Sequence, residues 1–362
     1  MKPYKFIISG GGTGGHIYPA VAIANELKLS YPGCKILFVG AKGKMEMEKV
    51  PQAGFPIKGL WIAGFHRNQP WRNLLIPFKL VVSFFQATWI LLRFRPHMAI
   101  GTGGFASGPL LLVASTLKIK TWIQEQNSFA GITNKLLAKS VGGIAVAYDG
   151  MERHFPKEKI YKTGNPVRSN LILPSEDRKG LMNKYGLDPD KKIVLVIGGS
   201  LGAKKINELI EAQLPFFKKH KIQLLWQCGA LYYERYAHLH AKEVQVFSFI
   251  KQMEEVFCLA DFIISRAGAG AIAELAIVGK PTLLIPSPNV AEDHQKHNAL
   301  SLIQKKAALM IEETDLTNSF PETFEHLLQN QQLQEELKRN LKAQAMPEAT
   351  KSIVSLIQKA LV

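Results

Sequence analysis

The chain has 362 residues, of which 47% are hydrophobic and 20% charged, and this composition excludes disorder over most of its length. A chain this long exceeds one ordinary hydrophobic core, so two domains are expected. The net charge of +16 is unevenly placed: residues 1–163 carry 21 basic and 7 acidic side chains, whereas residues 164–362 carry 24 and 22. The first half is therefore expected to face an anionic partner, such as nucleic acid, a membrane or a phosphorylated substrate.

The spacing of the cysteines and the length of the apolar runs indicate in which cellular compartment the protein is expected. Cys34, Cys228 and Cys258 lie far apart and form no C-x-x-C pair, which favours a reducing cytoplasm over a disulfide framework or a zinc site. The first residues lead into a strand pattern without the features of a signal peptide. The closest approach to an uninterrupted run of about 18 apolar residues is Leu80–Leu92, which has 13 residues without a formal charge, so a helix that spans a bilayer is not expected.

Short β-branched runs alternate with longer amphipathic segments in both halves, which is typical of βα units around a parallel sheet. The predicted strands are Lys5–Ser9, Lys35–Val39, Met98–Gly101, Thr121–Gln124 and Gly143–Ala147 in the first half, and Ile193–Ile197, Gln223–Gln227, Val244–Phe249, Phe262–Ser265 and Thr282–Ile285 in the second. Both halves open with an apolar strand, a glycine-rich turn and a helix. We therefore predict an α/β protein of two Rossmann-like parallel-sheet domains that face a central cleft.

The predicted domains are residues 1–165 and residues 166–347. A segment from Gly164 to Arg168 joins them, and its proline ends the preceding strand. Residues 348–362 have helical periodicity and can pack back on either domain.

The turn Gly10–Gly15 is so rich in glycine that its backbone amides can approach a ligand closely, and the helix that follows offers unpaired N–H groups. It lacks the spacing and the later acidic residue of a dinucleotide site, which disfavours a nicotinamide dehydrogenase. His16 stands where this turn enters its helix, and the helix dipole there favours the neutral imidazole, which can accept a proton. The alternative interpretation of His16 is a capping or core residue.

A second candidate region follows two later strands of the first half, at residues 101–107 and 124–127. Loops at the carboxyl ends of parallel strands face the ligand crevice, so Glu125 and Asn127 are expected to point toward it. Glu125 is a candidate to orient a substrate hydroxyl or a base. The alternative is turn formation and helix capping by Asn127.

The second half contains the residues expected to bind a nucleotide diphosphate. Gly198, Gly199 and Ser200 repeat the glycine turn, and the Arg168 guanidinium can bind the same anion. Glu274 is a candidate to bind ribose hydroxyls, and Gln295 is suited to sugar hydroxyls. Asp188 and Asp190 read as a turn rather than a magnesium site, so no metal ion is expected.

Between Trp61 and Arg95, aromatic and aliphatic residues are rimmed by arginine and lysine, a pattern typical of a surface that enters an anionic membrane leaflet. The alternative is a buried helix with basic edges. The predicted membrane contacts are Trp71, Leu74, Leu75, Ile76, Phe78, Lys79, Phe85 and Trp89. Nucleic acid is not an expected partner, because the sequence lacks a motif that reads bases.

Seven motifs occur in order along the chain: GGTGGHIYPA, GTGGFASGP, QEQN, GNPVR, GGSLGA, SRAGAGAIAE and DHQKHNA. In this order and at these separations they closely resemble the MurG family of glycosyltransferases. The resemblance extends from Ile7 to about Ala299 and implies the GT-B fold. It also implies an inverting transfer of N-acetylglucosamine (GlcNAc) from UDP-GlcNAc to the C4 hydroxyl of the N-acetylmuramic acid (MurNAc) in undecaprenyl-pyrophosphoryl-MurNAc-pentapeptide (lipid I). The product is lipid II, a precursor of peptidoglycan.

The resemblance further implies roles for the two domains. The first would bind lipid I and anionic lipids at the cytoplasmic face of the bacterial inner membrane, as a peripheral protein, and the second would bind UDP-GlcNAc. Other cell-wall and division proteins are candidate partners, and no cofactor is implied. Among the residues, the family pattern places Thr13, Gly14, Gly15 and Asn127 at the junction of acceptor and donor sugar, Arg168 and Ser200 at the diphosphate, Ile250, Ala269, Gly270, Ala271 and Glu274 at the uridine and ribose, and Gln295 at the donor sugar.

Within this resemblance, His16 is the expected general base or the partner of the base, and Glu125 is expected to assist it. Three other functions stay open from the sequence. One is a GT-B transferase for another lipid acceptor such as diacylglycerol, and another is a membrane-bound sensor of nucleotide sugars without catalysis. The third is a basic nucleic-acid binder, which would require an affinity for duplex DNA that falls steeply with salt.

Overall fold

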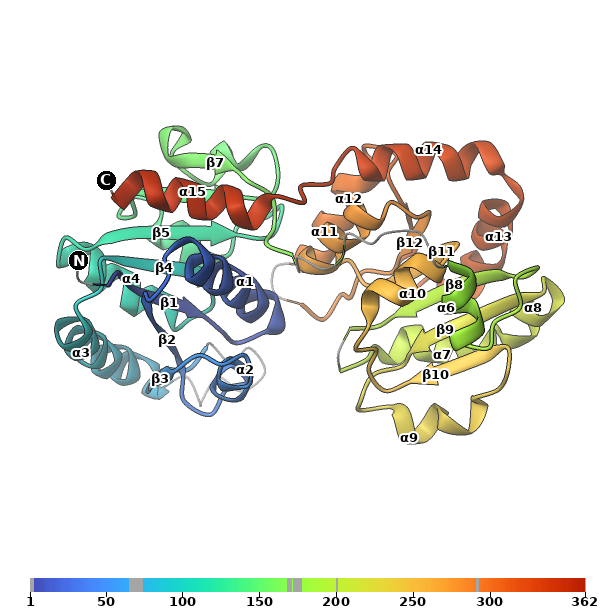
Figure 1. Ribbon diagram of the computed structural model, residues 1–362, viewed down its shortest axis with the longest axis horizontal. Coiled ribbons are helices and arrows are strands. Elements are labelled where there is room, and N and C mark those ends of the chain that lie inside the picture. Colours follow the sequence, from blue (N-terminus) through green and yellow to red (C-terminus); the bar gives the residue numbers. More distant parts are fainter. Residues whose placement is uncertain are drawn as a thin grey trace. The chain divides into compact units, whose positions relative to one another are not determined.

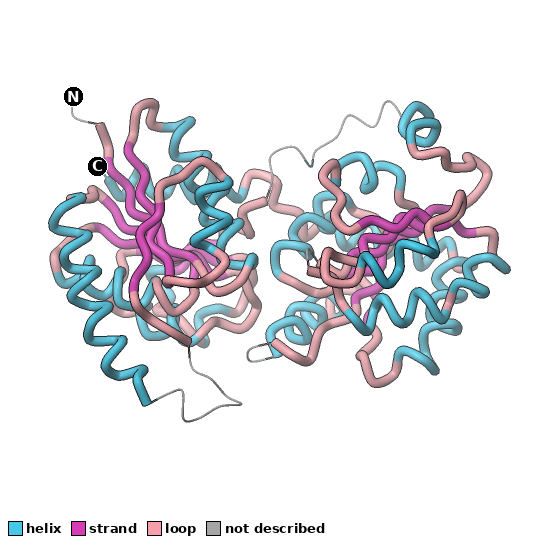
Figure 2. The backbone as a smooth tube through the Cα atoms, turned by 90° about the horizontal axis from the view of Figure 1, so that it is seen from below, coloured by secondary structure: helices cyan, strands magenta, loops and turns pink. Residues whose placement is uncertain are grey.

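A computed structural model describes residues 3–64, 74–167, 171, 178–199, 201–290 and 293–361. The chain divides into two compact units. Residues 1–167 and 346–362 form the N-terminal unit, and residues 168–345 form the C-terminal unit. Figure 2 shows that in each unit the strands form a layer with helices packed against it.

The N-terminal unit is built on a seven-stranded parallel sheet of order β3-β2-β1-β4-β5-β6-β7 (Figure 1). Its strands are β1 (Lys5–Gly10), β2 (Lys35–Ala41), β3 (Ile57–Leu60), β4 (Met98–Gly103), β5 (Lys120–Glu125), β6 (Gly143–Val146) and β7 (Ile160–Lys162). Its helices are α1 (Gly14–Ser30), α2 (Glu46–Gln52), α3 (Ile76–Phe94), α4 (Ser107–Thr116), α5 (Ile132–Leu137) and α15 (Ala349–Leu361).

This unit has a hydrophobic cluster on each face of its sheet, because successive side chains along a strand point to opposite faces. Phe6 and Ile8 of β1 pack in a cluster with residues of α1 and α15. Ile7, between them, packs in the other cluster with residues of α3 and α4. Strands buried on both faces read as continuous apolar runs, and this is why the sequence reveals them.

The last helix of the chain belongs to the N-terminal unit. Helix α15 packs against α1 (Figure 1). Ile353, Val354 and Ile357 are at most 2% exposed there and join the core of the α1 face. The chain therefore returns to its first unit after completing its second.

The C-terminal unit repeats the design with a six-stranded parallel sheet of order β10-β9-β8-β11-β12-β13. Its strands are β8 (Lys192–Ile197), β9 (Ile222–Gln227), β10 (Val244–Phe247), β11 (Phe262–Ser265), β12 (Thr282–Leu284) and β13 (Leu309–Met310). Its helices are α6 (Arg178–Lys184), α7 (Lys204–Ala212), α8 (Leu214–Lys219), α9 (Tyr233–Tyr236), α10 (Met253–Leu259), α11 (Ala269–Val278), α12 (His294–Ile303), α13 (Leu316–Gln329) and α14 (Gln331–Lys342).

The ten predicted strands are all confirmed, with ends that differ by a few residues. The sequence missed β3, β7 and β13. These three are short strands at the edges of their sheets. Lys58 interrupts β3, Lys162 ends β7, and β13 has only two residues, so these strands lack the longer apolar run that identified the central strands.

Candidate active site

The predicted ligand loops lie at the carboxyl ends of the central strands in both sheets. In the N-terminal unit the strand order reverses between β1 and β4, and in the C-terminal unit it reverses between β8 and β11. Helices that follow such neighbouring strands leave in opposite directions and open a crevice between the loops. Gly10–Gly15 begins at the last residue of β1, and Gly198–Gly199 follows β8, so both glycine turns lie where the strand order reverses.

The glycine turn of the N-terminal unit presents its backbone to solvent. Thr13 caps α1 in an extended conformation and is exposed, as is Gly15, while Gly14 is half-buried. The first N–H groups of a helix have no partner within the helix and carry partial positive charge. These three predicted residues are therefore accessible to an oxygen-rich ligand.

Glu46, at the start of α2, binds the backbone of this turn and was not predicted from the sequence. It is fully buried, its Oε2 accepts a hydrogen bond from the Gly12 N–H at 3.0 Å, and its Oε1 accepts one from the Ala41 N–H at 2.9 Å. A Cβ at position 11 would lie 2.3 Å from Glu46 Oε1, so this close contact requires glycine. A lone glutamate beside lysines gives no sequence signal of this role.

His16 lies against the end of β4. Its Nδ1 is 3.0 Å from Gln126 Oε1, and its backbone carbonyl accepts a hydrogen bond from Thr102 Oγ1 at 2.7 Å. Gly103, at φ +103°, lacks a Cβ that would lie 2.7 Å from the imidazole ring. The ring is half-buried, and within the described residues no hydrogen bond is formed to Nε2. Its place beside the glycine turn is suited to proton transfer.

Glu125, at the end of β5, is 1% exposed and both of its oxygens are engaged. Oε1 accepts from the backbone N–H of Asn127 at 3.0 Å, and Oε2 accepts from the Gly131 N–H at 3.0 Å and from Asn134 Nδ2 at 2.9 Å. These contacts favour a role in fixing the loop that carries Asn127, which is half-buried. The assistance of Glu125 to the base stays a prediction.

Gln227 joins two predicted parts of the nucleotide site in the C-terminal unit. Its Nε2 donates to the Gly199 carbonyl at 3.0 Å, and its Oε1 accepts from the Ile250 N–H at 2.9 Å. Gln227 is 3% exposed, and it was missed because it reads as the last residue of a buried strand. Arg168 and Ser200 lie outside the described residues.

The first turn of α11 contains three of the predicted uridine and ribose contacts. Ala269, Gly270 and Ala271 form this turn, in which Ala269 is buried and Gly270 and Ala271 are half-buried. Glu274 lies about one turn further along α11 and is half-buried. Asn298 of α12 donates to the Ala267 carbonyl at 3.3 Å, which ties the turn before α11 to α12.

Gln295, in the first turn of α12, forms a hydrogen bond within the unit through its amide oxygen. Its Oε1 accepts from the Ser287 N–H at 2.9 Å and so fixes the loop that follows β12. The amide nitrogen can still donate to a ligand.

Asp188 accepts from the Asp190 N–H at 3.0 Å, which confirms the predicted turn. Over the described ranges, no cluster of three His, Cys, Asp or Glu side chains could hold a metal ion.

Comparison with known proteins reveals the family. Residues 6–146 match the glycosyltransferase family 28 N-terminal domain, and residues 193–353 match the C-terminal domain of that family. A protein of Flavobacterium psychrophilum named UDP-N-acetylglucosamine--N-acetylmuramyl-(pentapeptide) pyrophosphoryl-undecaprenol N-acetylglucosamine transferase is 54% identical over 99% of this chain and 98% of its own length. The chain belongs to the MurG family.

Solved structures agree with the MurG family and with the GT-B fold. The crystal structure of Acinetobacter baumannii MurG is 29% identical, covers 99% of this chain and 100% of its own, and has a TM-score of 0.78. A UDP-GlcNAc 2-epimerase from Neisseria meningitidis, bound to UDP-GlcNAc, has a TM-score of 0.68 at 14% identity over 98% of this chain and 100% of its own. The second likeness shows the fold alone.

A row of exposed apolar side chains lies along α3, opposite the face that packs on the unit. The inner face buries Ser83, Ala87, Ile90 and Leu91. The outer row, together with two leucines that precede the helix, is called the α3 apolar face and consists of Leu74, Leu75, Phe78, Val81, Phe85, Trp89 and Leu92. Of the other predicted membrane contacts, Ile76 and Lys79 are half-buried, and Trp71 lies outside the described residues.

Helix α3 contains the apolar run from which no bilayer-spanning helix was expected. At 19 residues and a mean hydropathy of 1.3, it is long and apolar enough to cross a membrane by length and composition alone. The helix is longer than the uncharged run because it includes Lys79 and Arg93. Its inner face nevertheless packs on α4 and β3. Helix α3 is therefore a surface helix of the N-terminal unit in this structure.

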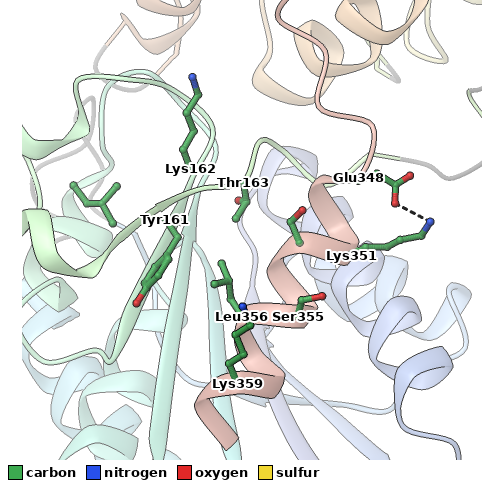
Figure 3. Close-up of a pocket in the computed structure, with 10 residues that line it drawn as sticks. Tyr161, Lys162, Thr163, Glu348, Lys351, Ser355, Leu356 and Lys359 are labelled. Atoms are coloured by element: carbon green, nitrogen blue, oxygen red, sulfur yellow. Dashed lines mark ion pairs between the residues drawn. The ribbon is translucent and has the colours of Figure 1, made fainter.

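A cavity of about 620 Å³ lies between β7 and α15, away from the predicted site (Figure 3). Lys162 and Lys351 line it, but each pairs with a carboxylate, Asp149 at 2.6 Å and Glu348 at 2.8 Å. No predicted site residue lines this cavity.

We predict that Glu46→Gln destabilises the N-terminal unit by about 1–3 kcal/mol, because the new amide NH₂ faces a buried backbone N–H in place of an acceptor. Denaturant unfolding measures the change. Glu48→Gln, on the same helix with a side chain 68% exposed, is the matched control and is expected to have little effect. Equal stability of the two variants would contradict the assigned role of Glu46.

Proposed function

We propose that this chain transfers GlcNAc from UDP-GlcNAc to the C4 hydroxyl of the MurNAc of lipid I and so makes lipid II for peptidoglycan. The observation that carries the proposal is its full-length similarity to enzymes named for this transfer. The geometry supports it, because a half-buried histidine adjoins a partly exposed glycine turn in one unit, and two turns of small residues, at Gly199 and at the start of α11, lie in the other.

The C-terminal unit is the proposed donor site. The Gly199 loop and the first turn of α11 supply backbone N–H groups for the diphosphate, with Arg168 and Ser200 as further contacts. Ile250 is proposed to contact the uracil and Glu274 the ribose, while the Gln295 amide binds the donor sugar. Gln227 connects the Gly199 loop to Ile250 through two hydrogen bonds.

The chemistry follows from the charges that develop. As the bond from the anomeric carbon to the diphosphate oxygen breaks, negative charge grows on UDP, and N–H groups and a guanidinium stabilise it. The acceptor hydroxyl attacks from the opposite face, which inverts the configuration and gives a β-1,4 linkage. His16 is the proposed base that takes the hydroxyl proton, with Thr13, Gly14, Gly15 and Asn127 around it.

The N-terminal unit is proposed to dock on the cytoplasmic face of the inner membrane through the α3 apolar face. Basic side chains accompany this face: Lys58 lies 4.7 Å from the ring centre of Trp89, and Lys79 lies 5.6 Å from that of Trp61. Aromatic residues with nearby cations suit the interface of an anionic bilayer. Such docking would bring the unit to a lipid-linked acceptor.

The proposal predicts acceptor specificity. Purified full-length protein with labelled UDP-GlcNAc is expected to transfer label to lipid I and not to diacylglycerol, and mass spectrometry and linkage analysis identify the product. Label in diacylglycerol alone would assign another acceptor. Binding of UDP-GlcNAc without transfer to either lipid would indicate a sensor.

His16→Ala is expected to lower kcat by about 10²- to 10⁴-fold, the usual contribution of a general base. The Kd for UDP-GlcNAc, measured by calorimetry, is expected to stay within about twofold, because the proposed contacts to the diphosphate, uracil and ribose lie in the other unit. His238→Ala, at an exposed histidine, is the control. Unchanged kcat in His16→Ala would remove His16 from the mechanism.

The double variant Phe85→Ser, Trp89→Ser is expected to weaken binding to phosphatidylglycerol vesicles by about tenfold or more, because each side chain loses apolar burial. Co-sedimentation measures the binding. Leu136→Ser is the control, since Leu136 is 77% exposed, close to the 74% of Phe85. Equal binding by the double variant and wild type would exclude the α3 apolar face as the docking surface.

A further inference from the structure

Three buried amide side chains form a chain of hydrogen bonds that ends at His16. They are Asn165, Gln124 and Gln126, at 5%, 1% and 2% exposure. Asn165 Oδ1 accepts from Gln124 Nε2 at 3.0 Å, and Gln124 Oε1 accepts from Gln126 Nε2. Gln126 Oε1 then faces His16 Nδ1 at 3.0 Å. The four side chains come from three separate segments of the N-terminal unit, because Gln124 and Gln126 both lie at the end of β5.

Backbone carbonyls fix which end of each amide faces which neighbour. Asn165 Nδ2 donates to the Gln126 carbonyl at 2.9 Å, so Asn165 must present its oxygen to Gln124. The two N–H groups of Gln126 Nε2 are shared among three acceptors: the Thr102 carbonyl at 2.7 Å, the Gln124 carbonyl at 3.1 Å and Gln124 Oε1. A flipped Gln126 would place its oxygen against these carbonyl oxygens and leave buried acceptors unpaired. The atom that meets His16 is therefore the amide oxygen.

An amide oxygen accepts a hydrogen bond, so His16 Nδ1 must donate one. In a neutral imidazole one nitrogen carries the proton and the other has the lone pair. The contact to Gln126 therefore leaves the lone pair of His16 on Nε2. The close packing of the ring on Gly103 holds its plane in place.

We propose that Gln126 is a positioning residue that holds neutral His16 with its proton on Nδ1 and thereby makes Nε2 the atom that accepts the substrate proton. The use of that proton acceptor in catalysis rests on the proposed function, whereas the tautomer itself does not. Gln126 does not touch the substrate in this scheme; it acts through His16.

The step balances with Nε2 as the acceptor. The O–H bond of the acceptor hydroxyl breaks as an N–H bond forms at Nε2, and the hydroxyl oxygen forms a bond to the anomeric carbon. The bond from that carbon to the diphosphate oxygen breaks, and its electron pair leaves with UDP. Gln126 Oε1 accepts from Nδ1 before and after this transfer, so the amide need not reorient as His16 gains charge. A neutral amide also avoids the strong preference for imidazolium that a carboxylate partner would create.

Nitrogen-15 NMR of histidine-labelled full-length protein tests the tautomer without substrate or turnover. His16→Ala assigns the resonances. At a pH where His16 is neutral, the wild type is expected to show a protonated Nδ1 and an unprotonated Nε2. A proton on Nε2 in the wild type would overturn the proposal by itself, whether or not any variant folds.

Gln126→Met keeps the side-chain volume but removes the acceptor. We expect its His16 spectrum to move toward the Nε2-protonated form, and kcat to fall about 10- to 100-fold with the KM for UDP-GlcNAc unchanged. Gln124→Met is the matched control, because it is equally buried while the Thr102 and Gln124 carbonyls still orient Gln126. It is expected to keep the wild-type tautomer.

The outcomes separate this inference from the proposed function. An unchanged tautomer in Gln126→Met, or an equal shift in Gln124→Met, would overturn the role of Gln126 even in an active transferase. Absence of transfer by a wild type with the expected tautomer would instead overturn the proposed function and leave the tautomer assignment in place.

Discussion

Loops at the carboxyl ends of parallel strands have backbone groups that the sheet no longer pairs, and this constraint shapes the candidate site. Buried carboxylates and amides pair these groups and so fix the loops. Glu46 accepts from the glycine turn, and Glu125 accepts from the loop that carries Asn127. Each carboxylate accepts at both of its oxygens, which compensates for its burial. A stable loop is the condition for placing His16.

In the C-terminal unit, a neutral side chain pairs the backbone groups of the loops that follow the strands. Gln227 donates to one loop and accepts from another, so one amide sets the spacing between the Gly199 turn and Ile250. An amide suits this position, because it supplies both a donor and an acceptor without placing a charge beside a proposed diphosphate. The two units thus share a fold and differ in the polar groups that hold their loops.

The N-terminal unit combines this ordered interior with an unusual surface. Helix α3 buries small and aliphatic side chains against the unit and exposes larger ones, including Phe85 and Trp89. A set of exposed large apolar residues on one helix marks an interaction surface. The excess of basic residues in the same half of the chain favours an anionic partner for it.

The sequence by itself determined the parallel α/β architecture, the central strands and the two glycine turns, because buried strands and tight turns depend on local residue patterns. It did not determine the edge strands β3, β7 and β13, which contain a lysine or are only two residues long and therefore show no such pattern. Only the tertiary structure decided that Glu46 supports Gly12, 34 residues away, and that Gln126 faces His16, 110 residues away. Hydrogen-bond partners at such separations follow from which strand ends the sheet order brings together, and local sequence carries no record of that order.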